Sequence, residues 1–199
     1  MIPICRNASF YHFLYFFRGD TNIKKTNTHD LVLAALCAAL TAVVAPFSIA
    51  IGPISLTLSV FAVLFTGAML RPGWAFAAQV VYIAIGAIGL PVFSGFKSGP
   101  QVLLGATGGY LVAYPLMALV LSLVCQHFKG FLPRLAGVIL AVAVCYTFGT
   151  AWFMFMSGND LATSLAWCVT PFVIPDLIKG VCALLLAKAL ESRLNKAAA

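Results

Sequence analysis

Long apolar segments separated by short polar breaks run through most of this sequence, and they restrict what it can fold into. Hydrophobic residues make up 62% of the 199 residues and charged residues 9%, with a mean hydropathy of +1.03. A soluble domain of this size cannot cover so much apolar surface, whereas lipid accepts apolar side chains on every face. A membrane barrel would require segments of about ten residues that alternate apolar and polar positions, and no such alternation occurs. The sequence therefore predicts an all-α integral membrane protein.

Six segments are apolar enough to be membrane helices, and most are close to the ~20 residues that cross a bilayer. They cover approximately residues 31–50, 56–70, 74–92, 104–125, 135–156 and 169–188. Turn-forming residues, charged residues or both interrupt the chain between them. We therefore expect six transmembrane helices, of which the second, bracketed by Pro53 and Pro72, is short.

The basic residues give these helices an orientation. An even number of crossings leaves both termini on one side of the membrane, and lysine and arginine concentrate on the cytoplasmic side. With the N- and C-termini cytoplasmic, ten of the twelve basic residues lie inside: Arg6, Arg18, Lys24, Lys25, Arg71, Lys129, Arg134, Lys188, Arg193 and Lys196. The net charge of +7 is therefore a signal of topology rather than of nucleic-acid binding, and we expect the lipid bilayer, not a nucleic acid, as the surrounding partner.

Residues 1–30 form an N-terminal extension that differs from the six-helix membrane substrate-binding domain expected for residues 31–199. The extension contains the aromatic run SFYHFLYFFRGD, which is too short to span a bilayer and lacks the cleavage site of a signal peptide. Aromatic side chains beside Arg18, Lys24 and Lys25 suit the depth of lipid headgroups. We interpret the extension as an interfacial segment of the inner leaflet. The alternative is a translation start assigned too early.

Asp176 and Lys179 bring opposite charges into the otherwise apolar sixth segment, in the motif PDLIKG. A charge at the middle of a bilayer costs about 2.5–3.5 kcal/mol on insertion scales, and residues three apart share one face of a helix. Both side chains should therefore face the interior of the bundle, near the outer end of the sixth helix. One interpretation is a buried salt bridge that fixes helix packing. We favour ligand binding, because a buried ion pair often adds little net stability.

The connection between the third and fourth expected helices, residues 86–111, has the composition of a lid. It contains seven glycines and two prolines together with Phe93, Phe96 and Lys97. Glycines allow backbone amides to approach a ligand closely, and the expected topology places this loop on the same side as Asp176. We interpret it as a lid over a pocket. A re-entrant turn or a close-packed loop without a ligand is the alternative.

The first expected helix, LVLAALCAALTAVVA, carries alanines four residues apart, a spacing at which membrane helices approach closely. Either these alanines pack within this chain, or they form an exposed surface on which another membrane subunit docks.

Motifs that would indicate catalysis are absent from the sequence. There is no G-x-x-x-x-G-K-[ST] phosphate-binding loop, no H-E-x-x-H and no G-x-S-x-G, and the five acidic residues are too few for a two-metal site. The six cysteines form no C-x-x-C pair and mostly lie in apolar runs, which indicates neither a zinc site nor a disulfide framework. We therefore expect no enzyme activity, no catalytic residue, no metal and no cofactor.

Four motifs give the chain a resemblance to a known family. They are GPISLTLSVFAVLFTGAMLRPGWA (52–75), YIAIGAIGLPVFSG (82–95), GATGGYL (105–111) and PDLIKG (175–180). In order and spacing, the chain resembles the BioY family, the biotin-specific S components (substrate-binding subunits) of energy-coupling factor (ECF) transporters, over roughly residues 31–195. The family usually has Pro-Thr or Pro-Ser where this chain has Ala106-Thr107. We expect this departure to alter the stiffness of the loop rather than the choice of ligand.

The resemblance implies a six-helix ECF S-component fold whose outward-opening pocket holds one biotin beneath the loop between helices three and four. It implies a transmembrane coupling protein and two cytoplasmic ATPase subunits as partners, in a bacterial cytoplasmic membrane. The residues that it places at the ligand are Asp176, Lys179, Lys97, Tyr110, Thr57, Phe93 and Gly95. The residues that match the docking helix of the family are Ala34, Ala35, Ala38 and Ala39.

The chemistry of biotin is compatible with the ion pair of the sixth helix. Its ureido ring offers two N–H donors and one carbonyl acceptor, next to an apolar ring and a chain that ends in a carboxylate. Asp176 can accept from the ureido N–H groups, and Lys179 can donate to the ureido oxygen or neutralise the carboxylate of the ligand. Charge-assisted bonds of this kind contribute about 1.5–3 kcal/mol each.

Three other functions stay open at this point. An S component for another vitamin would share the same architecture. A stand-alone secondary transporter would use Asp176 as a proton relay, and an intramembrane enzyme would convert its ligand into a product.

Overall fold

Six helices of 11 or more residues form most of the described part of the protein. The computed structural model describes residues 28–51 and 54–197. Its long helices are α2 (Thr28–Val44), α3 (Ser59–Met69), α4 (Pro72–Ile88), α6 (Gly108–His127), α7 (Phe131–Ser157) and α9 (Val173–Ala197). Its shorter elements are the strands β1 (Ser48–Ile51) and β2 (Ile54–Thr57), the 3-10 turn η1 (Ser94–Phe96), and the helices α5 (Pro100–Leu103) and α8 (Leu161–Cys168).

The long helices coincide with the six predicted apolar segments, although their ends differ by several residues. α6 and α7 are each long and apolar enough to cross a membrane, and α8 with α9 forms a third candidate span with a bend of 47°. α2, α3 and α4 are also apolar but have 17, 11 and 17 residues, fewer than the ~20 of a full crossing. The count of six crossings and the cytoplasmic termini therefore stay predictions.

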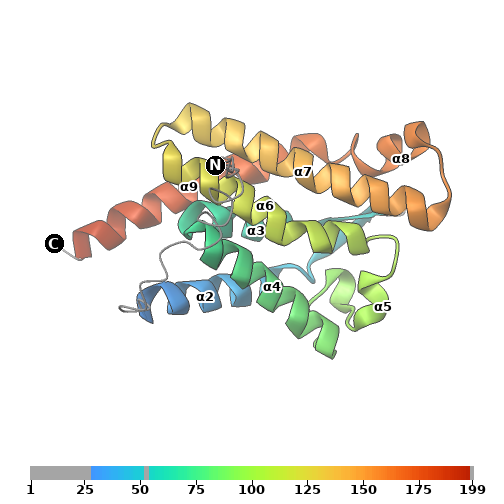
Figure 1. The fold of residues 1–199 in the computed structure, drawn as a ribbon, viewed down its shortest axis with the longest axis horizontal. Coiled ribbons are helices and arrows are strands. Elements are labelled where there is room, and N and C mark those ends of the chain that lie inside the picture. The colour runs from blue at the N-terminus through green and yellow to red at the C-terminus, as the bar shows by residue number, and fades with distance from the viewer. Residues whose placement is uncertain (1–27, 52–53, 198–199) are drawn as a thin grey trace, which may run out of the picture.

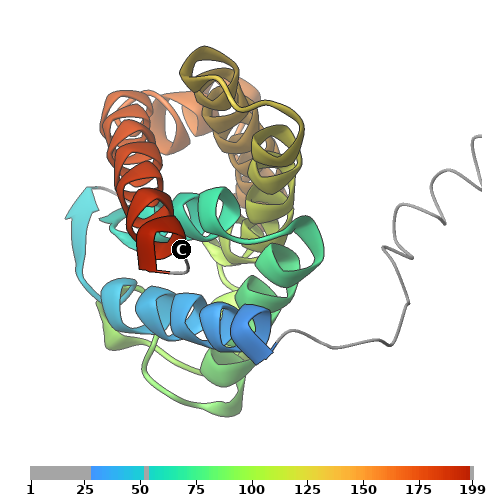
Figure 2. The ribbon, with the colours of Figure 1, turned by 90° about the vertical axis from the view of Figure 1, so that its left-hand side faces the viewer.

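The helices lie side by side along the long axis of the molecule (Figure 1). Seen from one end, α3 lies centrally, with α9 and α7 above it and α2 below it (Figure 2), and α3 contacts α2, α4, α6 and α9. The start of α2 and the end of α9 lie at one end of the bundle, and α5, α8 and the β1–β2 hairpin gather towards the other (Figure 1). This arrangement agrees with an even number of crossings.

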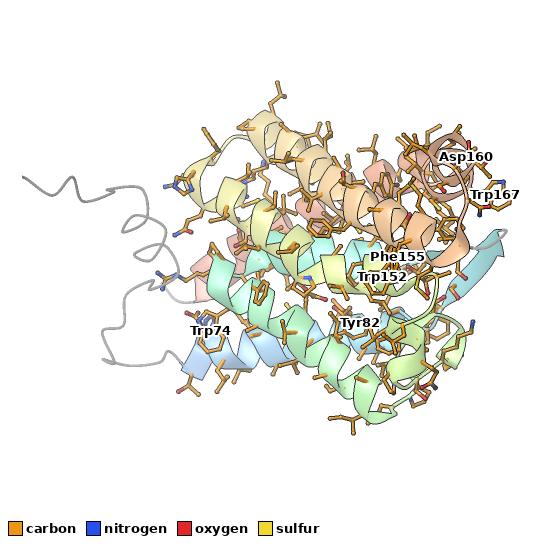
Figure 3. The ribbon with its side chains drawn as sticks, turned by 45° about the vertical axis from the view of Figure 1, so that its right-hand side comes forward. Trp74, Tyr82, Trp152, Phe155, Asp160 and Trp167 are labelled. Carbon is orange, nitrogen blue, oxygen red and sulfur yellow. The ribbon has the colours of Figure 1, made fainter. Side chains whose placement is uncertain are left out.

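Tryptophans mark the two ends of the molecule. Figure 3 shows Trp74, at the start of α4, at one end, and Trp167, in α8, close to Asp160 at the other. Tryptophan is enriched where the bilayer core meets the headgroups. Each end of the bundle therefore carries a tryptophan, the residue expected at a membrane surface.

A buried polar contact joins three helices in the interior. Gln79 of α4 is fully buried, and its Nε2 donates to the hydroxyl oxygens of Thr41 in α2 (3.3 Å) and Thr66 in α3 (3.1 Å). Each hydroxyl donates in turn to a backbone carbonyl one turn earlier, at Cys37 and Ala62 respectively. Because polar groups inside a membrane need internal partners, these bonds favour one position of α2 against α3 and α4.

α6 and α7 pack closely because glycines leave room at their contact. A Cβ on Gly149 of α7 would overlap the ring of Tyr110 in α6, and a Cβ on Gly109 of α6 would overlap Trp152 in α7. Trp152 also donates from Nε1 to the carbonyl of Gly105 at 2.9 Å, which holds the loop before α6 against α7. Figure 3 shows Trp152 in the half of the bundle that contains α8.

The β1–β2 hairpin and α8 are elements that the apolar pattern did not predict. β1 lies at the end of the first predicted segment and β2 at the start of the second, paired antiparallel with Ser48 opposite Thr57. A short apolar run does not distinguish a strand from part of a helix, so these four-residue strands were assigned to the neighbouring helices. α8 begins directly after Asp160, within a stretch predicted to be a connection.

Most of the predicted N-terminal extension lies outside the described residues. α2 begins at Thr28, three positions before the predicted boundary of the membrane domain. The interfacial role of the extension and the division into two regions therefore stay predictions.

Candidate functional site

A cavity lies at the end of the bundle that contains α5, α8 and the hairpin. Its empty volume, including the open solvent at its mouth, is about 850 Å³. Apolar and aromatic side chains form much of its wall, and a few polar groups converge on it. The lining residues that matter most below are Thr57, Phe93, Lys97, Tyr110, Tyr114, Tyr146, Phe172 and Asp176.

Asp176 is the buried acid of this cavity and is 4% exposed. Both carboxylate oxygens are bound from within the protein: Lys179 Nζ donates to Oδ1 at 2.9 Å, and the Tyr146 hydroxyl donates to Oδ2 at 2.9 Å. A carboxylate has about four acceptor positions, so each oxygen keeps capacity for a further donor. Asp176 can therefore accept two N–H groups from a molecule in the cavity.

The break between α8 and α9 places Asp176 at this position. Pro171 precedes α9, and Pro175 lies in its first turn, where proline is tolerated because the first N–H groups of a helix have no intrahelical partner. A carboxylate in the first turn is also favoured by the helix dipole. The Asp176 N–H donates to the Phe172 carbonyl at 2.9 Å, so a single turn presents the carboxylate and an aromatic ring to the same cavity.

The end of β2, at Thr57, is bound from two helices. Lys179 Nζ, from α9, donates to the Thr57 carbonyl at 2.7 Å. The hydroxyl oxygens of Thr57 and Ser59 are 2.5 Å apart, and the Ser59 oxygen lies 2.6 Å from the Tyr114 hydroxyl of α6. These contacts hold the end of the hairpin between α9 and α6.

The loop between α4 and α5 forms another wall of the cavity. Phe93 is fully buried and packs edge-to-face on Tyr82 with ring centroids 5.8 Å apart. The Phe93 N–H donates to the Lys97 carbonyl at 3.0 Å, and the Tyr82 hydroxyl donates to the Val92 carbonyl at 3.2 Å. A Cβ on Gly86 would overlap the Phe93 ring, so this glycine allows the loop to pack against α4. Lys97 is exposed and also lines the cavity.

Five of the seven predicted ligand residues line this cavity. They are Asp176, Lys97, Tyr110, Thr57 and Phe93. Lys179 and Gly95 line a second, neighbouring cavity, which is bounded by the hairpin and the η1 turn. Residues three apart on a helix point about 60° away from each other, and this angle is enough for Asp176 and Lys179 to face different cavities.

Three further residues line the cavity and were not predicted from the sequence: Tyr146, Tyr114 and Phe172. Tyr146 lies in the apolar run AVAVCYTFG of α7, and Tyr114 lies in an equally apolar part of α6. A buried tyrosine usually finds a partner for its hydroxyl, so a tyrosine inside an apolar helix is the signal that identifies both. Phe172 carries no such signal, because an aromatic residue in an apolar segment is ordinary.

The four alanines predicted to dock a partner divide between two faces of α2. Ala34 and Ala38 are buried in the core, with 6% and 3% exposed, whereas Ala35 and Ala39 are exposed. The first pair therefore packs within this chain. The second pair lies on a surface that another membrane protein can reach.

The apolar helices and the lined cavity define a helical membrane protein with an open cavity that can hold a small, partly polar ligand. In residues 28–51 and 54–197, no three His, Cys, Asp or Glu side chains are grouped so that they could hold a metal ion. The polar side chains that line the cavity include several hydroxyl groups, the Asp176 carboxylate and the Lys97 ammonium.

Sequence comparisons assign the chain to a family. The model of the BioY family matches residues 20–196. The chain is 37% identical over 162 residues to the probable biotin transporter BioY of Pyrococcus horikoshii, covering 81% of this chain and 96% of that protein. It is also 37% identical over 162 residues to the biotin transporter BioY of Thermotoga maritima, covering 81% and 95%. The chain belongs to the BioY family.

A solved structure shares the fold. The crystal structure of the S-component for biotin from an ECF-type ABC transporter matches with a TM-score of 0.78 and 25% sequence identity, over 84% of this chain and 95% of that one. The predicted all-α ECF S-component fold is thereby confirmed. The family consists of transporter components and is not a family of enzymes.

Proposed function

We propose that this protein binds biotin in the cavity beneath the loop between α4 and α5 and serves as the substrate-binding subunit of an ECF-type transporter. One observation carries the proposal: a BioY-family fold brings a buried carboxylate, aromatic walls and a lysine at the mouth into one cavity. The names of the relatives and of the matching structure, which refer to biotin, support the same ligand.

The groups around the cavity suggest how biotin is oriented. The ureido N–H groups donate to Asp176, whose oxygens are held by Tyr146 and Lys179. The apolar ring system packs against Phe93 and Phe172. The carboxylate of the ligand is neutralised by Lys97, which lines the cavity, whereas Lys179 is already bound to Asp176 and Thr57. Tyr110 and Thr57 provide hydroxyl groups along the wall.

Energy for uptake comes from other subunits in this proposal. The chain contains no phosphate-binding loop, so a transmembrane coupling protein and two cytoplasmic ATPase subunits drive transport across a bacterial cytoplasmic membrane. The exposed pair Ala35 and Ala39 forms part of the surface on which the coupling protein docks, because small residues four apart allow close helix approach. The protein itself captures and carries the ligand without converting it.

Purified full-length protein in lipid nanodiscs should bind one biotin per chain and reject other vitamins in a competition panel. Uptake into vesicles that also contain the coupling protein and both ATPases should require ATP. A different preferred vitamin would reassign the ligand. Uptake that needs no ATPase and collapses with the proton gradient would establish a secondary transporter, and conversion of biotin into a new product would establish an enzyme.

Replacing Lys97 with methionine should weaken biotin binding about 10-fold, which is the lower range for one charge-assisted bond. Because Lys97 is assigned to the ligand carboxylate, binding of biotin methyl ester should stay unchanged. Isothermal titration with both ligands measures the difference. Lys188→Met, which removes an exposed lysine from α9, is the matched control. An equal loss of affinity for the acid and the ester would contradict this orientation.

A further inference from the structure

Gln79 of α4 uses only the donor half of its buried amide. Nε2 donates to the hydroxyl oxygens of Thr41 and Thr66, at 3.3 and 3.1 Å, and the side chain is fully buried. Within the part of the chain that the structure describes, Oε1 has no hydrogen-bond partner. Turning the amide over would not supply one, because each hydroxyl already gives its single proton to a backbone carbonyl. The glutamine therefore carries the free-energy penalty of a buried, unpaired acceptor.

Stability does not explain a glutamine at this position. A leucine has nearly the same volume and would bring no unpaired acceptor into the contact. Thr41 and Thr66 would keep a partner without the amide, since their hydroxyls donate to the Cys37 and Ala62 carbonyls. A single polar residue between packed helices can fix their register at a cost in stability. The bonds of Gln79 fit this role.

α2 is the helix whose register needs fixing. It packs mainly on α4 and α3 and lies at the edge of the bundle, below α3 in Figure 2. Its buried stripe consists of Ala34, Cys37, Ala38 and Thr41. Lipid tails are as apolar as this stripe, and the small alanine side chains oppose sliding along the neighbouring helices only weakly. Thr41 is the stripe residue that hydrogen-bonds a side chain of α4, so this bond distinguishes one register from its alternatives.

We propose that Gln79 is a positioning residue for the docking surface of α2. Its amide fixes the height of α2 along α3 and α4, so that the exposed Ala35 and Ala39 meet the coupling protein in one register. The proposal rests on the proposed function for the identity of this partner, whereas the register of α2 is a property of the chain alone. Gln79 lines neither of the two cavities, so its role in docking is separable from the capture of biotin.

Gln79→Leu should weaken docking without weakening ligand binding. In detergent solution, the affinity for the coupling protein assembled with both ATPase subunits should fall about 10-fold, the loss expected for one or two neutral buried hydrogen bonds. Biotin affinity should stay within about 2-fold of the wild type. The melting temperature should be unchanged or higher, because the substitution removes an unpaired buried acceptor. Fluorescence titration measures docking, and isothermal titration measures biotin binding.

Two further variants separate register from general stability. Thr41→Val keeps the shape of the side chain but removes the α2 partner of the amide, so it should weaken docking to a similar extent. Ser122→Ala is the matched control. Ser122 of α6 is also buried, and its hydroxyl donates to the Leu70 carbonyl at the end of α3, a contact that does not involve α2. Its docking affinity should match the wild type even where its melting temperature is lower.

The register of α2 can be measured without any partner. Leu36 of α2 and Ile139 of α7 are both exposed and are replaced by cysteine for spin labels, in a background with Cys5 and Cys182 changed to serine. The other four cysteines are buried. With Gln79 present, pulsed electron paramagnetic resonance should give one narrow distance between the labels. In Gln79→Leu the distribution should broaden, by up to ~5 Å if α2 slides by one turn.

Each measurement can overturn the proposal. A broadened distance with unchanged docking would show that the register of α2 does not govern the partner. Weaker docking with an unchanged distance would show that Gln79 acts in another way, and an equal loss of docking in Ser122→Ala would describe a general stabilising role. A wild-type protein that does not bind the coupling protein would refute the proposed partner and, with it, the docking role. The distance measurement would then decide the register alone.

Discussion

Replacing Asp176 with asparagine is expected to lower biotin affinity at least about 100-fold. The carboxylate is proposed to accept two ureido N–H groups, and each charge-assisted bond contributes about 1.5–3 kcal/mol, with a tenfold change in affinity for each 1.4 kcal/mol. Asparagine also places an N–H donor opposite the donors of the ligand and leaves Lys179 without its carboxylate. The loss of biotin affinity should therefore exceed that expected from removing one hydrogen bond. Isothermal titration of the purified variants in nanodiscs measures it.

Asp160→Asn is the matched control for this substitution. Asp160 is an exposed carboxylate before α8, and the hydrogen bond from Thr163 lowers its pKa, so it is charged at neutral pH. This variant should bind biotin like the wild type. The circular dichroism spectrum and melting temperature of Asp176→Asn establish that it is folded. If folded Asp176→Asn kept wild-type affinity, the assignment of the ureido ring to this carboxylate would be wrong.

Replacing Gly149 with alanine is expected to damage stability and ligand binding together. The added Cβ would overlap the ring of Tyr110, which lines the cavity and whose hydroxyl lies 3.4 Å from that of Thr150. The ring must move into the cavity or α6 must separate from α7. Overpacking of this kind costs typically ~1–3 kcal/mol. We expect a melting temperature lower by several degrees and biotin affinity lower by at least about 10-fold.

Gly73→Ala shows whether the close contact, rather than the loss of a glycine, causes these effects. Gly73 lies in the first turn of α4, and a Cβ there meets nothing within 4 Å. Because alanine is the better helix former, this variant should be neutral or slightly more stable, with unchanged biotin affinity. A Gly149→Ala protein with wild-type melting temperature and affinity would contradict the α6–α7 packing described above.

Hydropathy was sufficient to predict the long helices, because lipid-facing segments are apolar along their whole length. It could not predict the hairpin, since β1 and β2 are apolar runs of four residues that continue the pattern of the neighbouring helices. α8 was not predicted because it has only eight residues and follows a polar stretch, so it was assigned to a connection between helices. Both omissions lie at the end of the bundle that contains the cavity.

Site residues were predictable where a charged side chain lies in an apolar helix or in a loop expected near the site. Asp176 was predicted because a carboxylate inside an apolar helix is costly, and Lys97 because it lies within the aromatic, glycine-rich loop expected on the same side as Asp176. The direction of Lys179 was not predictable, since it depends on the strand that receives its hydrogen bond. A tyrosine inside an apolar helix marks Tyr146 as notable, but its partner Asp176 is fixed only by the packing of α7 against α9.

The start of α2 and the end of α9 share the end of the bundle away from the hairpin and α8 (Figure 1). Helix α9 rises about 1.5 Å per residue, so a reporter or surface tether fused behind it sits roughly 30 Å from Asp176. A molecule immobilised through the end of α9 would thus turn the opening of the cavity towards the flowing solution. Biosensor experiments on this protein can therefore use a carboxyl-terminal attachment without obstructing the entry of the vitamin.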